Sequence, residues 1–234
     1  MIRSLVANGL NKMLLRFDAQ IMHRSALYDW QRNPVEKGAY NSVELPVDAR
    51  AYLRPDNPRL VELQRRYAAF SSDVTTPSFW QEGHLTTEDI AWFRGDNPYV
   101  WQRRGPNMNA MGYAMAFYYA KSIDTLGLLE TLHEDQAFGI FTHHVSNKVI
   151  SRDLIDSVIE IYFLEKHLGI SSQPGLNILD IGAGYGRLAH RAVSALPGLG
   201  RYFCTDAVAI STFVSEYYLR YRGRRTENLG DSAG

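Results

Sequence analysis

The chain lacks most features that mark secreted, membrane-spanning or nucleic-acid-binding proteins. It has a single cysteine, Cys204, in 234 residues, so no disulfide can form within the chain. Because Cys204 lies in an apolar stretch, we expect a buried, inert thiol in a reducing, cytoplasmic location. Lys and Arg total 25, as do Asp and Glu, giving a formal net charge of zero. Binding to nucleic acid or to an anionic membrane is therefore disfavoured.

A long hydrophobic run is also missing. Polar residues interrupt the first 22 positions, so this segment lacks the continuous apolar core of a signal peptide or of an integral membrane segment, and neither is expected. Apolar residues at near-helical spacing, from Ile2 to Phe17, instead predict an amphipathic helix. Its apolar face should pack on the rest of the protein, with contact at a membrane surface as the alternative.

Helix start and stop signals are frequent through the first 170 residues. Asn57 followed by Pro58 predicts a helix start after an irregular, proline-containing segment, and Thr86 or Thr87 could cap a short helix ending near Phe93. One or two helices are expected over 110–132. Ser151 through Leu168 forms the clearest helical pattern, with Leu154, Ile155, Val158, Ile161, Tyr162 and Leu168 inward and Gly169 as its stop.

The segment 175–191, GLNILDIGAGYGRLAHR, carries the strongest functional signal. Its apolar run predicts a buried strand over 176–181, and three alternating glycines then precede a helical pattern that begins at Arg187. Glycines permit a tight turn and close approach of the backbone to a ligand. The G-x-G-x-G spacing differs from the G-x-G-x-x-G of dinucleotide sites and favours S-adenosylmethionine over NAD.

A second strand and helix follow this motif. A strand is expected over 201–208 and a helix over 211–222, with a right-handed crossover between the two strands. Asp206 follows Gly186 by about 20 residues, where a carboxylate can accept hydrogen bonds from two ribose hydroxyls. Asp180 could orient the turn or meet a methionyl ammonium group. The structural alternatives are a simple tight turn for the glycines and a solvated strand-end carboxylate for Asp206.

The text LDIGAGYGRLAHR, followed by CTDAVAISTFVSEYYLRYRG, resembles class I S-adenosylmethionine-dependent methyltransferases. Among them it is similar to bacterial sugar O-methyltransferases associated with surface-polysaccharide genes. Residues 118–170 share this similarity, which covers roughly residues 50–222. The resemblance implies an α/β fold with a helical N-terminal region and a partial Rossmann-like core. It also implies methyl transfer to a sugar hydroxyl and a cofactor site formed by Asp180, Gly182, Ala183, Gly184, Tyr185, Gly186 and Asp206.

The chain departs from that family after residue 222. Members of the family continue through further strands, one of which pairs with the other side of the motif strand, so we expect a C-terminally truncated core with an exposed strand edge and self-association. The expected organisation is a mainly helical region over 1–150, a partial cofactor-binding core over 151–222 and a disordered tail over 223–234. The alternatives are a non-catalytic remnant, a partner-binding protein, or an NAD-dependent reductase, which the glycine spacing and the lack of a following Tyr-x-x-x-Lys disfavour.

The acceptor side of the site is less marked. Hydroxyl methylation needs a base, but each histidine (His84, His133, His143, His144 and His190) is more typical of surface or core packing, so no catalytic residue is assigned. No metal site is expected, since His143 and His144 are adjacent and point apart. Aromatic residues that could stack on a saccharide acceptor, or simply pack, are Trp80, Trp92, Phe93, Tyr99 and Trp101, beside Gln102, Arg103 and Arg104; Tyr113, Tyr118 and Tyr119 could shield the cofactor.

Overall fold

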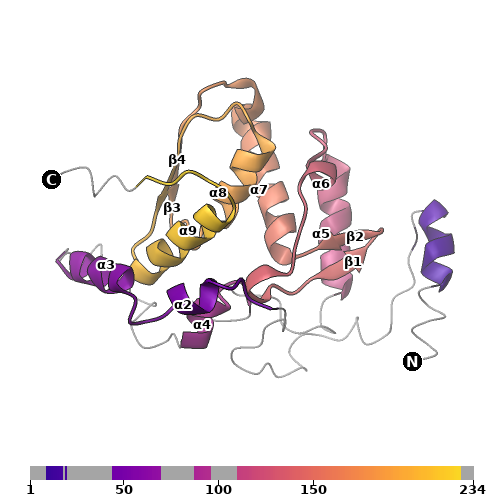
Figure 1. Ribbon diagram of the computed structural model, residues 1–234. Helices are drawn as coiled ribbons and strands as arrows, with labels where there is room; N and C mark the ends of the chain where they lie inside the picture. The colour runs from indigo at the N-terminus through magenta and orange to yellow at the C-terminus, as the bar shows by residue number, and fades with distance from the viewer. Residues whose placement is uncertain (1–8, 18, 20–43, 70–86, 96–109, 228–234) are drawn as a thin grey trace.

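The computed structural model describes residues 9–17, 19, 44–69, 87–95 and 110–227 (Figure 1). Helices dominate these residues and accompany two small sheets, so the chain is a mixed α/β structure, as expected. The aromatic residues Trp80, Tyr99 and Trp101, the residues Gln102, Arg103 and Arg104, His84 and the tail beyond residue 227 lie outside the described residues.

The described elements follow the order expected from the sequence, with two additions that were not predicted: a short helix near residue 50 and a β-hairpin over 143–150. The helices are α2 (Ala49–Tyr52), α3 (Pro58–Ala68), α4 (Thr87–Ala91), α5 (Ala110–Ile123), α6 (Leu128–Thr131), α7 (Arg152–Leu168), α8 (Arg187–Ala195) and α9 (Ala209–Tyr221). Short 3-10 turns are η1 (Leu15–Phe17), η4 (Ala137–Gly139) and η5 (Ile170–Ser172). The strands are β1 (His143–Val145), β2 (Lys148–Ile150), β3 (Ile178–Ile181) and β4 (Tyr202–Thr205).

The helix start predicted at Asn57 and the helix predicted from Ser151 to its stop at Gly169 are confirmed, whereas Thr86, one of two proposed caps of the short helix, lies outside the described residues. The Asn57 side chain accepts a hydrogen bond from the Arg59 N–H at 2.8 Å, and Ser151 accepts one from the Leu154 N–H at 3.0 Å. Gly169 ends α7 in the left-handed conformation, at φ 60°. The inward position predicted for Leu168 is wrong: this side chain is 58% exposed, and Ile170, beyond the turn at Gly169, is the residue buried in the core.

The strands β3 and β4 pair in parallel, with Ile178 opposite Tyr202 and Ile181 opposite Thr205, and α8 lies between them in sequence. β1 and β2 form a separate antiparallel hairpin. Figure 1 shows α7, α8 and α9 on the same side of the β3–β4 pair, and α3 packs against α9. The strand, glycine turn, helix and strand predicted from the sequence are therefore all present.

One face of this strand pair is open. Successive side chains alternate between faces, and the Tyr202 and Cys204 side faces the helices, because Tyr202 packs against a helical core cluster and the Cys204 thiol interacts with Ser215 of α9. On the other face Leu179 is 61% exposed and Ile181 82% exposed. The prediction of a buried strand is wrong for these two residues, since in the described part of the chain helices cover only one face.

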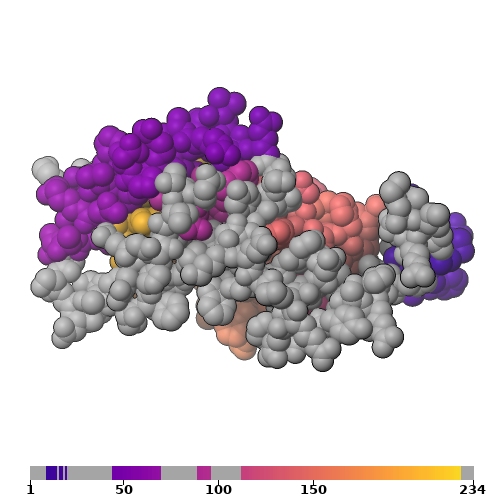
Figure 2. Space-filling view, turned by 90° about the horizontal axis from the view of Figure 1, so that it is seen from below, coloured from indigo at the N-terminus to yellow at the C-terminus, as the bar shows by residue number. Residues whose placement is uncertain are grey.

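The core consists of two clusters. One joins α2, α3 and residues 90–93 to α9 and Tyr185, and the other joins α5, α6, β1 and β2 to α7 and α8. Both combine residues from before and after position 150, so the helical region packs directly on the α/β unit. Seen from below, residues 44–69 form a continuous surface beside part of the C-terminal segment (Figure 2). The domain boundaries themselves remain a prediction.

The predicted packing of the N-terminal helix against the rest of the protein is wrong at several positions that the structure describes. Leu10, Met13 and Phe17 are exposed, so the apolar face of the N-terminal helix does not pack on the protein at these described positions. None of the helices within the described ranges combines the length and apolarity that crossing a membrane requires.

Candidate functional site

The glycine loop of residues 182–186 joins β3 to α8. Its three glycines all have positive φ, at 84° for Gly182, 57° for Gly184 and 85° for Gly186. Such angles are costly for residues with a Cβ, which explains glycine at each position. The N–H groups of Gly182 and Ala183 donate to the Thr205 carbonyl at 2.8 and 3.0 Å, so the loop rests against the end of β4.

The glycines differ in what surrounds them. A Cβ on Gly186 would lie 3.0 Å from the Ser215 hydroxyl oxygen and 3.2 Å from Leu219 Cγ, so this glycine lets α8 approach α9 closely. A Cβ on Gly182 or Gly184 would meet no atom within 4 Å. The loop therefore has one side packed against a helix and one side open to a ligand.

Asp206 contacts this loop through its side chain. Its Oδ2 accepts a hydrogen bond from the Gly184 N–H at 3.0 Å, and its Oδ1 accepts one from the Val208 N–H at 2.9 Å. Both residues follow the carboxyl ends of parallel strands, which meet at one edge of the sheet. Each carboxylate oxygen retains a lone pair after these contacts, so Asp206 can still accept hydrogen bonds from a ligand.

Tyr67 of α3 is a site residue that sequence analysis missed. Its hydroxyl donates to the Asp206 carbonyl at 3.1 Å and lies 2.6 Å from the Thr212 hydroxyl oxygen. In the sequence Tyr67 is one member of an apolar helical stripe, and nothing local signals a contact 139 residues away. The N-terminal helical region thus reaches the loop that carries Asp206.

Asp180 lies on the helix-facing side of β3. Its Oδ2 accepts a hydrogen bond from the Tyr202 hydroxyl at 2.9 Å, and its carbonyl accepts one from the Thr205 hydroxyl at 3.1 Å. Burial and the nearby Asp180 carboxylate raise the pKa of the half-buried Cys204 thiol to about 12. The thiol stays protonated at neutral pH, which agrees with the inert cysteine expected from the sequence.

Tyr185, the fourth residue of the loop, is buried. Its ring lies 5.2 Å from the Phe93 ring and 5.1 Å from the Tyr218 ring, and its hydroxyl donates to the Asp153 carboxylate. Burial and the Asp153 charge raise the pKa of Tyr185 well above its usual value. The side chain therefore faces the core, and the backbone of Tyr185 is the part available on the open side of the loop.

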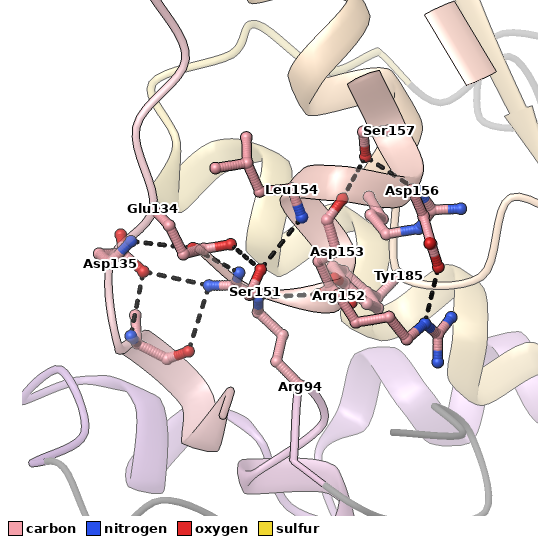
Figure 3. Close-up of polar contacts among 12 residues, drawn as sticks. Arg94, Glu134, Asp135, Ser151, Arg152, Asp153, Leu154, Asp156, Ser157 and Tyr185 are labelled. Atoms are coloured by element: carbon pink, nitrogen blue, oxygen red, sulfur yellow. Dashed lines mark hydrogen bonds and ion pairs between the residues drawn. The ribbon is translucent and has the colours of Figure 1, made fainter. Parts of the chain in front are cut away.

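Behind Tyr185 lies a buried cluster of charged side chains centred on Arg94 (Figure 3). The Arg94 guanidinium contacts Glu134 at 2.8 Å, Asp135 at 3.1 Å and Asp153 at 3.4 Å, and its side chain is fully buried. Neither Arg94 nor these acids stand in a sequence motif that predicts a role for them. The positions lie on separate segments, so only the fold brings them together.

Arginines lower the pKa values of two acids of this cluster, Glu134 and Asp135. Burial alone would raise the pKa of Glu134, but the charges of Arg94 and Arg191 lower it. Burial would also raise the pKa of Asp135. A hydrogen bond from Arg222 and the charge of Arg94 outweigh burial, so the pKa of Asp135 lies well below its usual range. The cluster thereby links residues 94 and 134–135 to α7, α8 and α9.

The residues considered for the acceptor side are mostly packing residues where the structure describes them. Phe93 and Trp92 are buried in the core, and His143 stacks on the Tyr113 ring at 4.2 Å. Burial and the surrounding arginines lower the pKa of His190 to about 3, so its imidazole is a weak base. Across the described ranges no three His, Cys, Asp or Glu side chains gather as metal ligands would.

Comparison with protein-family models, with curated proteins and with solved structures finds no match to this chain. The functional evidence is therefore the geometry of the chain itself. Its central elements are the glycine loop, Asp206 at the end of the neighbouring strand, and Tyr67 from the N-terminal region.

Proposed function

We propose that the chain binds S-adenosylmethionine at the glycine loop and is a class I methyltransferase that methylates a hydroxyl of a saccharide or other small acceptor. The observation that carries the proposal is the contact between the Gly184 N–H and Asp206 Oδ2, at 3.0 Å. It joins the glycine motif to the distal acid at the carboxyl ends of two parallel strands. In open α/β sheets this end is where ligands bind.

The loop and the acid suit the two polar ends of such a cofactor. The first turn of α8 presents N–H groups without intrahelical partners and the positive end of the helix dipole, which favour the cofactor carboxylate. Asp206 can accept hydrogen bonds from the ribose hydroxyls. The open sides of Gly182 and Gly184 leave room for the ligand to approach the backbone.

Methyl transfer to a hydroxyl is an in-line displacement that depends chiefly on positioning of the two reactants. Tyr67 places α3 beside the Asp206 loop, so the N-terminal region borders the proposed cofactor site. The resemblance to sugar O-methyltransferases supports a saccharide acceptor. No described histidine has the setting of a catalytic base.

The decisive experiment is calorimetry on the full chain with S-adenosylhomocysteine, S-adenosylmethionine and NAD. We expect the first two to bind and NAD to bind more weakly, because the loop has the tighter glycine spacing. NAD binding the more tightly, or no binding of S-adenosylhomocysteine, would overturn the proposal. Transfer of a labelled methyl group to saccharide acceptors then tests the reaction itself.

A second candidate, a non-catalytic protein that binds a partner through its strand pair, has one observation in its favour. Leu179 and Ile181 expose apolar side chains on β3, which among the described residues pairs with β4 alone. Cofactor binding without any methyl transfer would favour this candidate.

A further inference from the structure

Tyr185 is the residue of the glycine loop whose aromatic ring packs into a core cluster. Three of the five loop residues are glycines, which open the loop to a ligand but also give its backbone unusual freedom. Ordering a free backbone costs conformational entropy, and a binding loop that is already ordered binds more tightly. The loop therefore needs an anchor, and the Tyr185 ring between Phe93 and Tyr218 is placed to provide it.

The Tyr185 hydroxyl donates a hydrogen bond to the Asp153 carboxylate (Figure 3). Asp153 lies in the first turn of α7, has no exposed surface and is fixed by the Ser151 cap of that helix. The same carboxylate oxygen, Oδ2, lies 3.4 Å from Arg94 Nε. A buried carboxylate without a nearby cation would be strongly disfavoured, and the Arg94 guanidinium supplies that cation beside Asp153.

Arg94 is itself held on its other side. Its guanidinium contacts Glu134, Asp135 and the Ala137 carbonyl, and its main-chain N–H donates to the Phe138 carbonyl at 3.1 Å. Phe138 is fully buried and has φ 60°, an unusual conformation for a bulky residue. The guanidinium thus has a fixed place between residues 134–138 and α7.

We propose that Arg94 and Asp153 are positioning residues that act through Tyr185 to hold the glycine loop in its ligand-binding conformation. Residue 94, far from the motif in sequence, thereby controls the affinity of the cofactor site. The proposal rests on the proposed function for the identity of the ligand. The order of the loop before a ligand arrives does not depend on that identity.

The hydrogen bond from the Tyr185 hydroxyl to Asp153 is here called the tether. Tyr185→Phe tests it with the smallest change, because it removes the hydroxyl and keeps the ring. Tyr162→Phe is the matched control: the Tyr162 hydroxyl donates to Asp124 at 2.7 Å, so the substitution breaks the same kind of bond away from the loop. We expect Tyr185→Phe to weaken S-adenosylhomocysteine binding about tenfold by calorimetry, and Tyr162→Phe to change it less than about twofold. Equal effects of the two variants would assign Tyr185 a purely structural role and overturn the proposal.

Arg94→Lys, alone and combined with Tyr185→Phe, tests whether Arg94 acts through the tyrosine. Arg94→Lys should lower affinity in the wild-type background and have little further effect on affinity once the Tyr185 hydroxyl is gone. Arg94→Lys should lower the melting temperature both in the wild type and in Tyr185→Phe, because it removes the contacts of the Arg94 guanidinium with Glu134 and Asp135 in either protein. Additive losses of affinity would overturn the role assigned to Arg94.

Hydrogen exchange of the ligand-free protein separates failure of this proposal from failure of the proposed function. Amides of 182–189 should exchange faster in Tyr185→Phe than in the wild type or in Tyr162→Phe. If the wild type binds no S-adenosylhomocysteine, the methyltransferase proposal fails, and the exchange experiment still decides the tether. If the wild type binds and Tyr185→Phe changes neither affinity nor exchange, the tether alone is rejected.

Discussion

The Asp206 carboxylate holds the Gly184 N–H at 3.0 Å across 22 residues of sequence. This single bond ties the loop after β3 to the loop after β4 and gives the acid two roles. It stabilises the turn, and in the proposed function its remaining lone pairs accept hydrogen bonds from the cofactor ribose.

Asp206→Ala should weaken S-adenosylhomocysteine binding by on the order of 1.5–3 kcal/mol, the range for hydrogen bonds to a charged acceptor. Calorimetry measures the affinity, and thermal melting measures the loss due to the freed Gly184 and Val208 amides. Asp124→Ala is the control, because Asp124 likewise accepts two main-chain N–H groups, from Leu128 and Leu129, far from the loop. If both variants lower affinity equally, Asp206 is a structural strand-end acid.

Gly184→Val should abolish ligand binding, since its branched side chain would project into the open side of the loop. The strain of a β-branched residue at φ 57° also destabilises the protein, so a matched glycine is needed. Gly127, at φ 68° with equally open surroundings, provides it. Gly127→Val should lower the melting temperature to a similar extent and leave calorimetric affinity intact; retained binding by Gly184→Val would place the ligand elsewhere.

The free energy of unfolding should fall as the pH falls from 7 to 5. The pKa of His190 is depressed to about 3 in the folded protein and is about 6.5 when unfolded, so the unfolded state takes up the proton first. The stability that depends on a neutral His190 is fully present above pH 6.5 and is lost progressively as the pH falls toward 3. The groups facing His190 are the Tyr218 ring and four arginines: Arg94, Arg191, Arg222 and Arg224.

Urea unfolding measures this effect. After allowance for solvent screening at a partly exposed side chain, we expect a loss on the order of 1 kcal/mol between pH 7 and pH 5. His190→Gln, which cannot titrate, should lose less over the same range. His167→Gln, at an exposed position of α7, should retain the wild-type slope. Identical slopes for wild type and His190→Gln would contradict the assignment.

The strand pair should mediate self-association of the chain. Leu179 and Ile181 expose apolar side chains on β3. One edge of β3 pairs with β4, and no described strand pairs with the backbone groups of its other edge. Light scattering should show dimers or larger species for the wild type and a lower mass for Leu179→Lys combined with Ile181→Lys. Met115→Lys, which changes an exposed apolar residue of α5, should not lower the mass. A monodisperse wild-type monomer would refute this prediction.

Much of the local structure was readable from the sequence. Asn57 with Pro58, Ser151 and Gly169 set helix ends because caps and left-handed turns depend on the residue at that position and its immediate neighbours. The strand, glycine turn and helix around Gly184 followed from the same kind of short-range chemistry. The hydrogen bond between Asp206 and the Gly184 N–H was not predicted, although it follows once the two strands pair in parallel and their ends coincide.

Contacts between distant segments were decided only by the tertiary structure. Tyr67 reads as one more apolar helical residue, and Arg94, Asp153 and Tyr185 carry no local sign of one another. The exposure of Leu179 and Ile181 likewise depends on which elements cover β3, and not on their own hydrophobicity. Sequence patterns report the conformational preferences of neighbouring residues, whereas burial and charge pairing depend on how separate helices pack, so the sequence determined the glycine loop and the fold decided what holds it.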